Sequence, residues 1–307
     1  MFASSTGGPA NRPLEAFQEN GRWYGTFRRG RSMTPVDEAE LERLDILHKL
    51  FLVLRREALH SAPIVNLANP RILDVGCGTG IWGIDMADKY PTGNVLGIDL
   101  NLIQPEFIPS NILFMQKDIE MSWQDMEPGT WDLIHLRTLN GSIASWPAMY
   151  SEVYRHLKPY DGHIEHVEID WTPRTDDPAT VIEGTPIDRW ANDLFEVMDN
   201  YGRSMRLDSN LTKQRLNDAG FTDIREEVMQ VPFNAWPSDR HGRELGRWFD
   251  LSLRTGYQAL SLAPFARGLN RTAAEVNDFV EQVYTQTHKK EFHGYVRVHI
   301  FTARKPQ

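Results

Sequence analysis

Apolar residues recur at helical spacing between residues 37 and 60, where Leu41, Leu44 and Leu47 share one face and charged residues take the other. This pattern predicts an amphipathic helix ahead of the first strand. Downstream, apolar runs typical of strands alternate with segments that can form helices. Such alternation is typical of an α/β fold with a parallel sheet covered on both faces. The strand-like runs lie at 71–75, 95–99, 112–116, 131–136 and 163–169.

The second half of the chain continues the pattern with further helices and two more strands. Residues 233–293 are rich in apolar residues and lack the composition of a loop, so they predict a helical cap inserted before the last strand. Gly220 stands where a helix C-cap is expected. Helices are predicted at 81–90, 147–157, 184–202 and 209–219, and the two further strands at 224–231 and 295–304.

Composition and charge exclude several classes of protein. The chain has 307 residues and a formal net charge of −9, and its longest basic cluster is at 28–31, so direct binding to a nucleic-acid backbone is not expected. A single cysteine, Cys77, excludes an intramolecular disulfide and favours a reducing compartment, either the nucleus or the cytoplasm. Apolar runs fall far short of the roughly 18 residues that span a bilayer, so no membrane association is expected.

A glycine-rich loop follows the strand predicted at 71–75 and precedes a helix. Glycine lets the backbone turn sharply and lie against a ligand because no Cβ intervenes. Ile81, at the sixth position of the motif, argues against a dinucleotide fingerprint, and the acid before the first glycine would repel a pyrophosphate. The loop therefore suits a ligand with a positive charge. Its candidate binding residues are Asp74, Gly76, Cys77, Gly78 and Gly80.

Two more acids stand at equivalent ends of the next two predicted strands. A carboxylate at Asp99 can accept hydrogen bonds from both hydroxyls of a ribose. Asp118 could accept the amino group of an adenine, with Ile119 as an apolar neighbour of the ring. An aspartate after a strand is more often a turn or N-cap residue when taken alone. Together with Asp74, however, the series points to S-adenosylmethionine, with its methionine end near the glycine loop.

Seven motifs between Glu19 and Lys305 are similar to those of a known family. They lie at 19–24, 43–51, 78–82, 103–105, 131–136, 167–170 and 260–265. The chain resembles the class I S-adenosylmethionine-dependent methyltransferases and, within them, the fungal LaeA-like group.

The resemblance implies a Rossmann-like seven-stranded sheet with an antiparallel last strand, an N-terminal helical lid and a helical insertion before that strand. The cofactor pocket would lie at the C-terminal ends of the strands. The implied organisation is a disordered leader at 1–18, a lid and helix at 19–62, and a class I methyltransferase domain at 63–307, with its helical cap at about 233–293.

Further candidate residues follow from the family motifs and from the strand ends. Leu100 and Gln104 are assigned to the cofactor site, and so is Arg137, through its backbone. Tyr24 lies in a glycine-flanked aromatic segment that either closes over the cofactor or packs as a terminal arm. His135 could act as a base, although a histidine in a buried strand is more often a core residue. We assign no catalytic residue and no metal ligand.

The resemblance leaves two classes of function open. In the first, the protein is an active methyltransferase in fungal secondary metabolism, as a regulator or a tailoring enzyme, with a small metabolite or a protein as methyl acceptor. In the second, it is a regulatory S-adenosylmethionine-binding subunit of a velvet-type nuclear complex with little turnover of its own. An intact glycine loop and acid series favours cofactor binding in both.

Overall fold

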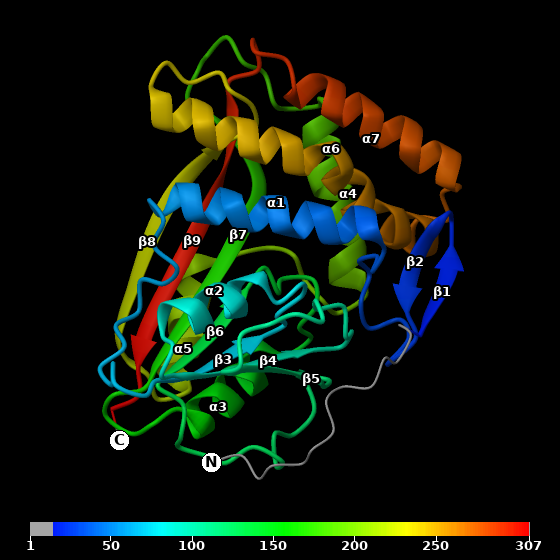
Figure 1. The fold of residues 1–307 in the computed structure, drawn as a ribbon. Helices are drawn as coiled ribbons and strands as arrows, with labels where there is room; N and C mark the ends of the chain where they lie inside the picture. The colour runs from blue at the N-terminus through cyan, green and yellow to red at the C-terminus, as the bar shows by residue number, and fades with distance from the viewer. Residues whose placement is uncertain (1–14, 307) are drawn as a thin grey trace.

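A seven-stranded sheet forms the centre of the protein in the computed structural model, which describes residues 15–306 (Figure 1). Its strands are β3 (Arg71–Val75), β4 (Asn94–Asp99), β5 (Ile112–Gln116), β6 (Leu133–Arg137), β7 (His163–Thr175), β8 (Thr222–Pro232) and β9 (Gly294–Arg304). They lie in the order β5-β4-β3-β6-β7-β9-β8, and β9 pairs antiparallel with both of its neighbours. The strand pairs β5–β4, β4–β3, β3–β6 and β6–β7 are all parallel. The predicted α/β, Rossmann-like sheet with an antiparallel last strand is confirmed.

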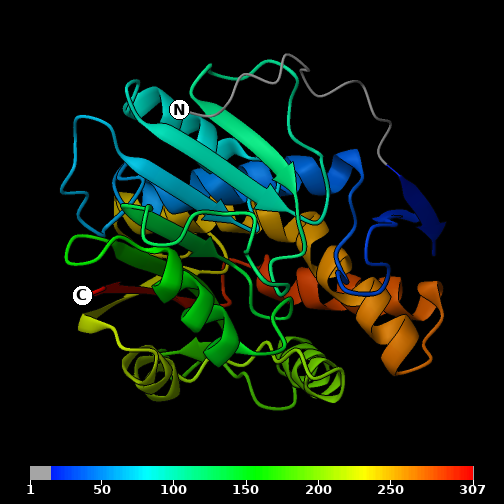
Figure 2. The same ribbon diagram turned by 90° about the horizontal axis from the view of Figure 1, so that it is seen from below.

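Helices cover both faces of this sheet (Figure 2). Successive side chains of a strand point to opposite faces. Accordingly, Ile72 packs in a cluster with Trp82 from the helix that follows β3, whereas its neighbour Leu73 packs in a cluster with Tyr150 from the helix that follows β6. The helices are α1 (Glu38–Leu54), α2 (Ile81–Lys89), α3 (Trp146–His156), α4 (Pro186–Asn200), α5 (Ser209–Asp218), α6 (Arg240–Gly268) and α7 (Ala273–Thr287).

The segment between β8 and β9 contains α6 and α7, within the range predicted for a helical cap. Helix α6 packs against α1, and the two helices lie side by side (Figure 1). Phe51 of α1 and Phe249, Leu253 and Tyr257 of α6 belong to the same buried cluster. Within residues 15–306, no helix is long and apolar enough to cross a membrane.

Some element boundaries differ from those predicted. Helix α1 ends at Leu54 rather than near residue 60, because Arg56 and Glu57 have positive φ angles of 52° and 66°, which a right-handed helix cannot contain. Strand β7 continues to Thr175 because it stays paired with β9 beyond a bulge. Trp131 lies outside β6 and forms only an isolated bridge.

An antiparallel hairpin that the sequence pattern did not predict precedes α1. Its strands are β1 (Ala16–Glu19) and β2 (Arg22–Gly25), joined through Asn20 and Gly21, both at positive φ, as a tight hairpin turn requires. The leader predicted for residues 1–18 is therefore wrong for residues 16–18, which belong to β1, and residues 1–14 lie outside the described part of the chain.

Candidate functional site

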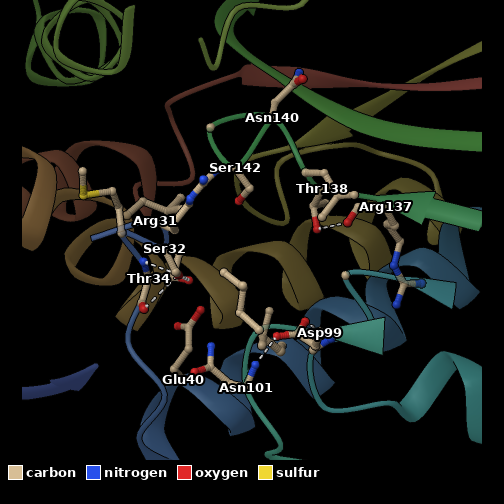
Figure 3. Close-up of a pocket in the computed structure, with 18 of the residues that line it drawn as sticks. Arg31, Ser32, Thr34, Glu40, Asp99, Asn101, Arg137, Thr138, Asn140 and Ser142 are labelled. Atoms are coloured by element: carbon tan, nitrogen blue, oxygen red, sulfur yellow. Dashed lines mark hydrogen bonds between the residues drawn. The ribbon is translucent and has the colours of Figure 1, made fainter. Parts of the chain in front are cut away.

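The main cavity lies where the C-terminal ends of β3, β4 and β6 and the segment after β5 face α1 (Figure 3). Parallel strands end at the same edge of a sheet, so residues far apart in the sequence meet there. The predicted cofactor residues that line it are Gly76, Gly78, Asp99, Leu100, Asp118, Ile119 and Arg137. A smaller cavity shares Gly76, Gly78 and Arg137 with it and is also lined by Asp74 and Cys77.

The glycine loop is held against β4, and its glycines have positive φ angles that disfavour larger residues. The backbone N–H groups of Gly76 and Cys77 both donate to the carbonyl oxygen of Ile98, at 2.8 and 3.1 Å. Gly76 has a φ of +70°, and a Cβ built on it would lie 2.5 Å from Cδ2 of Leu139. Gly78, at φ +55°, has open space beside it, where a Cβ would meet only a leucine methyl of α1 at 3.6 Å. The loop thus presents bare backbone to both cavities.

Asp99 stands at the end of β4 and fastens the glycine loop. Its Oδ2 accepts the N–H of Gly78 at 2.9 Å, and its Oδ1 accepts the N–H of Asn101 at 2.9 Å. Burial raises the pKa of Asp99 to about 6, although both backbone hydrogen bonds act in the opposite direction. Each carboxylate oxygen can accept a second hydrogen bond, so Asp99 can still bind two hydroxyls of a ligand.

Asp118 follows β5 and is only partly satisfied. Its Oδ1 accepts the N–H of Glu120 at 3.1 Å. Its Oδ2 is buried and has no hydrogen-bond partner among residues 15–306, while Nε of Arg28 and Nε of Arg31 lie 3.6 and 3.7 Å away. A buried acceptor without a partner is costly unless a ligand donor completes it. Asp118 therefore fits the amino group of an adenine.

Residues 31–36, which we call the cover segment, line the main cavity between the hairpin and α1. Nη1 of Arg31 donates to Oε2 of Glu120 at 2.6 Å, and Nη2 of Arg203 donates to the same oxygen at 2.6 Å. Oε1 of Glu120 accepts the N–H of Ala144 at 2.7 Å. Burial acts to raise the pKa of Glu120, but this N–H and the two arginines hold the pKa below its ordinary value. Glu120 thus ties the cover segment to the sheet.

Comparison with known proteins identifies the family. A family model described as a methyltransferase domain matches residues 45–226. A secondary metabolism regulator of Cochliobolus heterostrophus is 46% identical over 311 residues, which cover 99% of this chain and 99% of that protein. Another, from Fusarium oxysporum f. sp. lycopersici, is 40% identical over 296 residues, covering 95% and 93%. The chain belongs to the LaeA-like methyltransferase family.

This LaeA-like protein is accordingly an S-adenosylmethionine-dependent methyltransferase. The matched residues run from α1 to β8 and include the glycine loop and all three acids. Solved structures resemble it more distantly. Phosphoethanolamine N-methyltransferase 2 of Haemonchus contortus, in complex with S-adenosyl-L-methionine, aligns with a TM-score of 0.47 and 17% identity over 87% of this chain and 52% of that chain.

Three predicted cofactor residues of this LaeA-like methyltransferase do not line either cavity. Gly80, at φ +77°, is the N-cap of α2 and packs against Phe114. Nε2 of Gln104 donates to the carbonyl oxygen of Gly78 at 2.6 Å, so Gln104 supports the loop from behind. Tyr24 is 2% exposed and packs with Phe17 in the core, which favours the packing arm over the aromatic lid. In this structure the three residues pack behind or beside the cavities, and their direct contact with a cofactor stays a prediction.

His135 is also a core residue rather than a base that faces the cavities. Its ring stacks on Trp82 at 3.7 Å between centroids, and its Nδ1 lies 3.0 Å from Oδ1 of Asp74. Burial lowers the pKa of His135 well below its ordinary value, so the imidazole is neutral and donates from Nδ1. Burial also raises the pKa of Asp74 to about 7.

Much of the wall of the main cavity was not predicted as a site. Glu168 of β7 lines it, and its Oε1 accepts the N–H groups of Leu139 and Asn140, at 2.7 and 3.0 Å, and Nε2–H of His166 at 3.1 Å. The family motifs at 167–170 and 260–265 were the signal that could have found part of this wall. Other residues of the wall are Ile169, Trp171, Met198, Met205, Leu260 and Pro264.

Proposed function

We propose that the main cavity and the smaller cavity together bind S-adenosylmethionine, and that the protein acts as a regulator of secondary metabolism by methyl transfer. The observation that carries the proposal is the convergence of the glycine loop, Asp99 and Asp118 on one cavity at the edge of the sheet. When bound, the cofactor would supply an electrophilic methyl group on a positively charged sulfur. The relatives named as secondary metabolism regulators support the regulatory part of the proposal.

The nucleoside would be held by the main cavity. Asp99 has one free acceptor position on each oxygen for the two ribose hydroxyls, because its other positions are taken by backbone N–H groups. The unpartnered Oδ2 of Asp118 would accept the adenine amino group. Leu100 and Ile119 line the same wall and would contact the faces of the ring.

The methyl acceptor would occupy the part of the main cavity between β7 and α6. This part is mainly apolar, and Glu168 is its buried carboxylate. Because Oε1 of Glu168 already accepts three hydrogen bonds and Oε2 makes none with residues 15–306, Oε2 is available to an acceptor N–H or O–H. Methyl transfer needs mainly alignment and exclusion of water, and a base only where the nucleophile carries a proton. The cover segment would exclude the water.

We further propose that the protein works in the nucleus or the cytoplasm, with a velvet-type protein as partner. The support is its family membership and its high identity to secondary metabolism regulators. Fractionation of cells that carry a tagged copy tests the location. Co-purification of the full chain with a recombinant velvet protein tests the partner, and elution of the two proteins in separate peaks would reject it.

Two measurements test the methyltransferase proposal. Calorimetric titration of the full chain with S-adenosylhomocysteine reports on the cofactor site. Transfer of tritiated methyl from S-adenosylmethionine into a fungal extract, separated into small-molecule and protein fractions, reports on the acceptor. The Asp99→Asn variant serves as the binding-deficient control. A protein that binds no S-adenosylhomocysteine, or an extract labelled equally with the intact protein and the variant, would overturn the proposal.

A further inference from the structure

Arg137 is a half-buried cation without a matching anion among residues 15–306. It is the last residue of β6, and it lines both cavities (Figure 3). The guanidinium lies over the ring of Phe51, at 4.9 Å from the centroid. No carboxylate oxygen of residues 15–306 lies within 4.0 Å of it. Burial lowers the pKa of Arg137 to about 10, so it remains charged at neutral pH. An unpaired buried charge is costly, and an anionic ligand would relieve that cost.

The backbone carbonyl of Arg137 accepts one hydrogen bond from the neighbouring residue, and the side chain offers a separate contact to a ligand. The hydroxyl of Thr138 donates to the carbonyl oxygen of Arg137 at 2.8 Å (Figure 3). Thr138 itself has a φ of 54°, and its N–H donates to the carbonyl oxygen of Val167 at 2.9 Å. The predicted contact through the backbone stays a prediction, and the guanidinium offers a second contact.

His48 contacts this guanidinium, and Asp85 contacts His48 in turn. Nη1 of Arg137 lies 3.3 Å from Nδ1 of His48, on α1. Arginine can only donate, so Nδ1 must be the unprotonated nitrogen, and His48 carries its proton on Nε2. Nε2 in turn lies 2.9 Å from Oδ2 of Asp85, on α2. Burial and the charge of Arg137 lower the pKa of His48, although Asp85 acts in the opposite direction, which keeps the ring in this neutral form.

The smaller cavity presents one acidic and one basic side chain to a ligand. Asp74 and Arg137 both line it, and they form no ion pair with each other. The rest of its wall includes Leu44, Leu47 and Phe51 of α1 together with bare glycine backbone. A small chamber with one carboxyl group and one guanidinium matches a zwitterion, whose ammonium and carboxylate groups carry the complementary charges.

We propose that Asp85 and His48 are positioning residues that orient Arg137 to bind the carboxylate of the cofactor's amino acid group. The inference rests on the proposed cofactor site and deepens it. Asp85 fixes the tautomer of His48, and His48 fixes the direction of the guanidinium before the ligand arrives. Such pre-organisation strengthens binding because little side-chain freedom is lost when the ligand binds.

Binding of two nucleosides can be compared to test the role of Arg137 apart from the rest of the site. S-adenosylhomocysteine carries the amino acid group, whereas 5′-methylthioadenosine lacks it and keeps the adenine, the ribose and the sulfur. Calorimetry on the full chain should show that Arg137→Ala lowers the affinity for S-adenosylhomocysteine by about tenfold or more. This is the loss expected when a hydrogen bond to a charged group is removed. The affinity for 5′-methylthioadenosine should change by less than about twofold.

The positioning residues have matched variants. His48→Phe keeps the ring but removes both nitrogens, and we expect a loss of about three- to tenfold for S-adenosylhomocysteine only. His48→Gln can accept from Arg137 and donate to Asp85, so it should restore most of that loss. Asp85→Ala should resemble His48→Phe. Rescue by glutamine is a result that a purely structural role for His48 would not produce.

The outcomes distinguish this inference from the proposed function. If the unaltered protein binds neither nucleoside, the cofactor site itself is wrong. If it binds both nucleosides equally tightly, or if Arg137→Ala weakens both by the same factor, the cofactor site stands and the carboxylate role of Arg137 is wrong. If His48→Gln behaves like His48→Phe, the positioning role of His48 is wrong. Continued binding of 5′-methylthioadenosine shows that each variant is folded.

Discussion

Replacement of Asp99 by asparagine should separate cofactor affinity from stability. Each oxygen of Asp99 accepts one backbone N–H, from Gly78 or Asn101, and has one position left for a ribose hydroxyl. Asparagine keeps one accepting oxygen and replaces the other by an NH₂ group that cannot accept. The variant therefore loses one bond to the ribose and one to the backbone. A hydrogen bond to a charged group contributes about 1.5–3 kcal/mol, so affinity for S-adenosylhomocysteine should fall by about tenfold or more.

The free energy of unfolding should change much less, because two effects oppose each other. The pKa of Asp99 is raised from 3.8 to about 6 in the folded protein, so the unfolded chain loses this proton first as the pH rises. The ionised carboxylate therefore destabilises the ligand-free protein above pH 6, by at most about 3 kcal/mol, and does not do so below about pH 4. Asparagine removes that cost because it carries no charge. Its NH₂ group, however, leaves one of the two backbone N–H groups without an acceptor, which costs about 1–3 kcal/mol.

Calorimetry and thermal unfolding at pH 7 test both parts. The melting temperature of Asp99→Asn should stay within about 5 °C of that of the unaltered protein. Asp88→Asn, the same substitution at an exposed position of α2, should change neither quantity. Unchanged affinity in a folded Asp99→Asn protein would show that Asp99 does not bind the ribose, and the reasoning from its free acceptor positions would be wrong.

Three further changes test other parts of the site. Gly78→Val places a β-branched residue at a φ of +55°, and we expect the melting shift caused by S-adenosylhomocysteine to disappear, whereas a normal shift would contradict our placement of the loop. Hydrogen exchange should slow in residues 31–36 on addition of S-adenosylhomocysteine while Ala16–Gly25 stays unchanged, and equal exchange in both states would show that the cover segment is permanently docked. Glu120→Gln weakens the contact with Arg31 that holds the cover segment closed, so S-adenosylhomocysteine should dissociate about three- to tenfold faster in stopped-flow measurements. An unchanged rate would show that this contact does not hold the cover segment over the ligand.

The strands and most helices could be predicted from the sequence because their signals are local. An apolar run followed by glycines reports a buried strand that ends in a sharp turn, and the run at 71–75 became β3. Asp99 and Asp118 could be placed at one site because parallel strands bring their C-terminal ends to the same edge. The hairpin before α1 was missed because its two strands have only four residues each.

The sequence alone could not tell which residues support the site and which line it. Gly80 and Gln104 belong to the same motifs as true lining residues, yet they pack behind the glycine loop. Tyr24 looked like a lid residue because it follows no apolar periodicity, and only the packing of the hairpin against α6 buries it. A pattern records how apolar a position is, but not which surface will cover it.

Local sequence therefore determined the α/β architecture, the glycine loop and the series of acids, since each depends on a few consecutive residues and on the geometry of parallel strands. The tertiary structure alone decided the rest of the site. It brought the cover segment, β7 and α6 around one cavity, and it joined Asp85 and His48 to Arg137 from three separate elements. Contacts between distant segments depend on how whole helices pack on the sheet, and no short stretch of sequence records that packing.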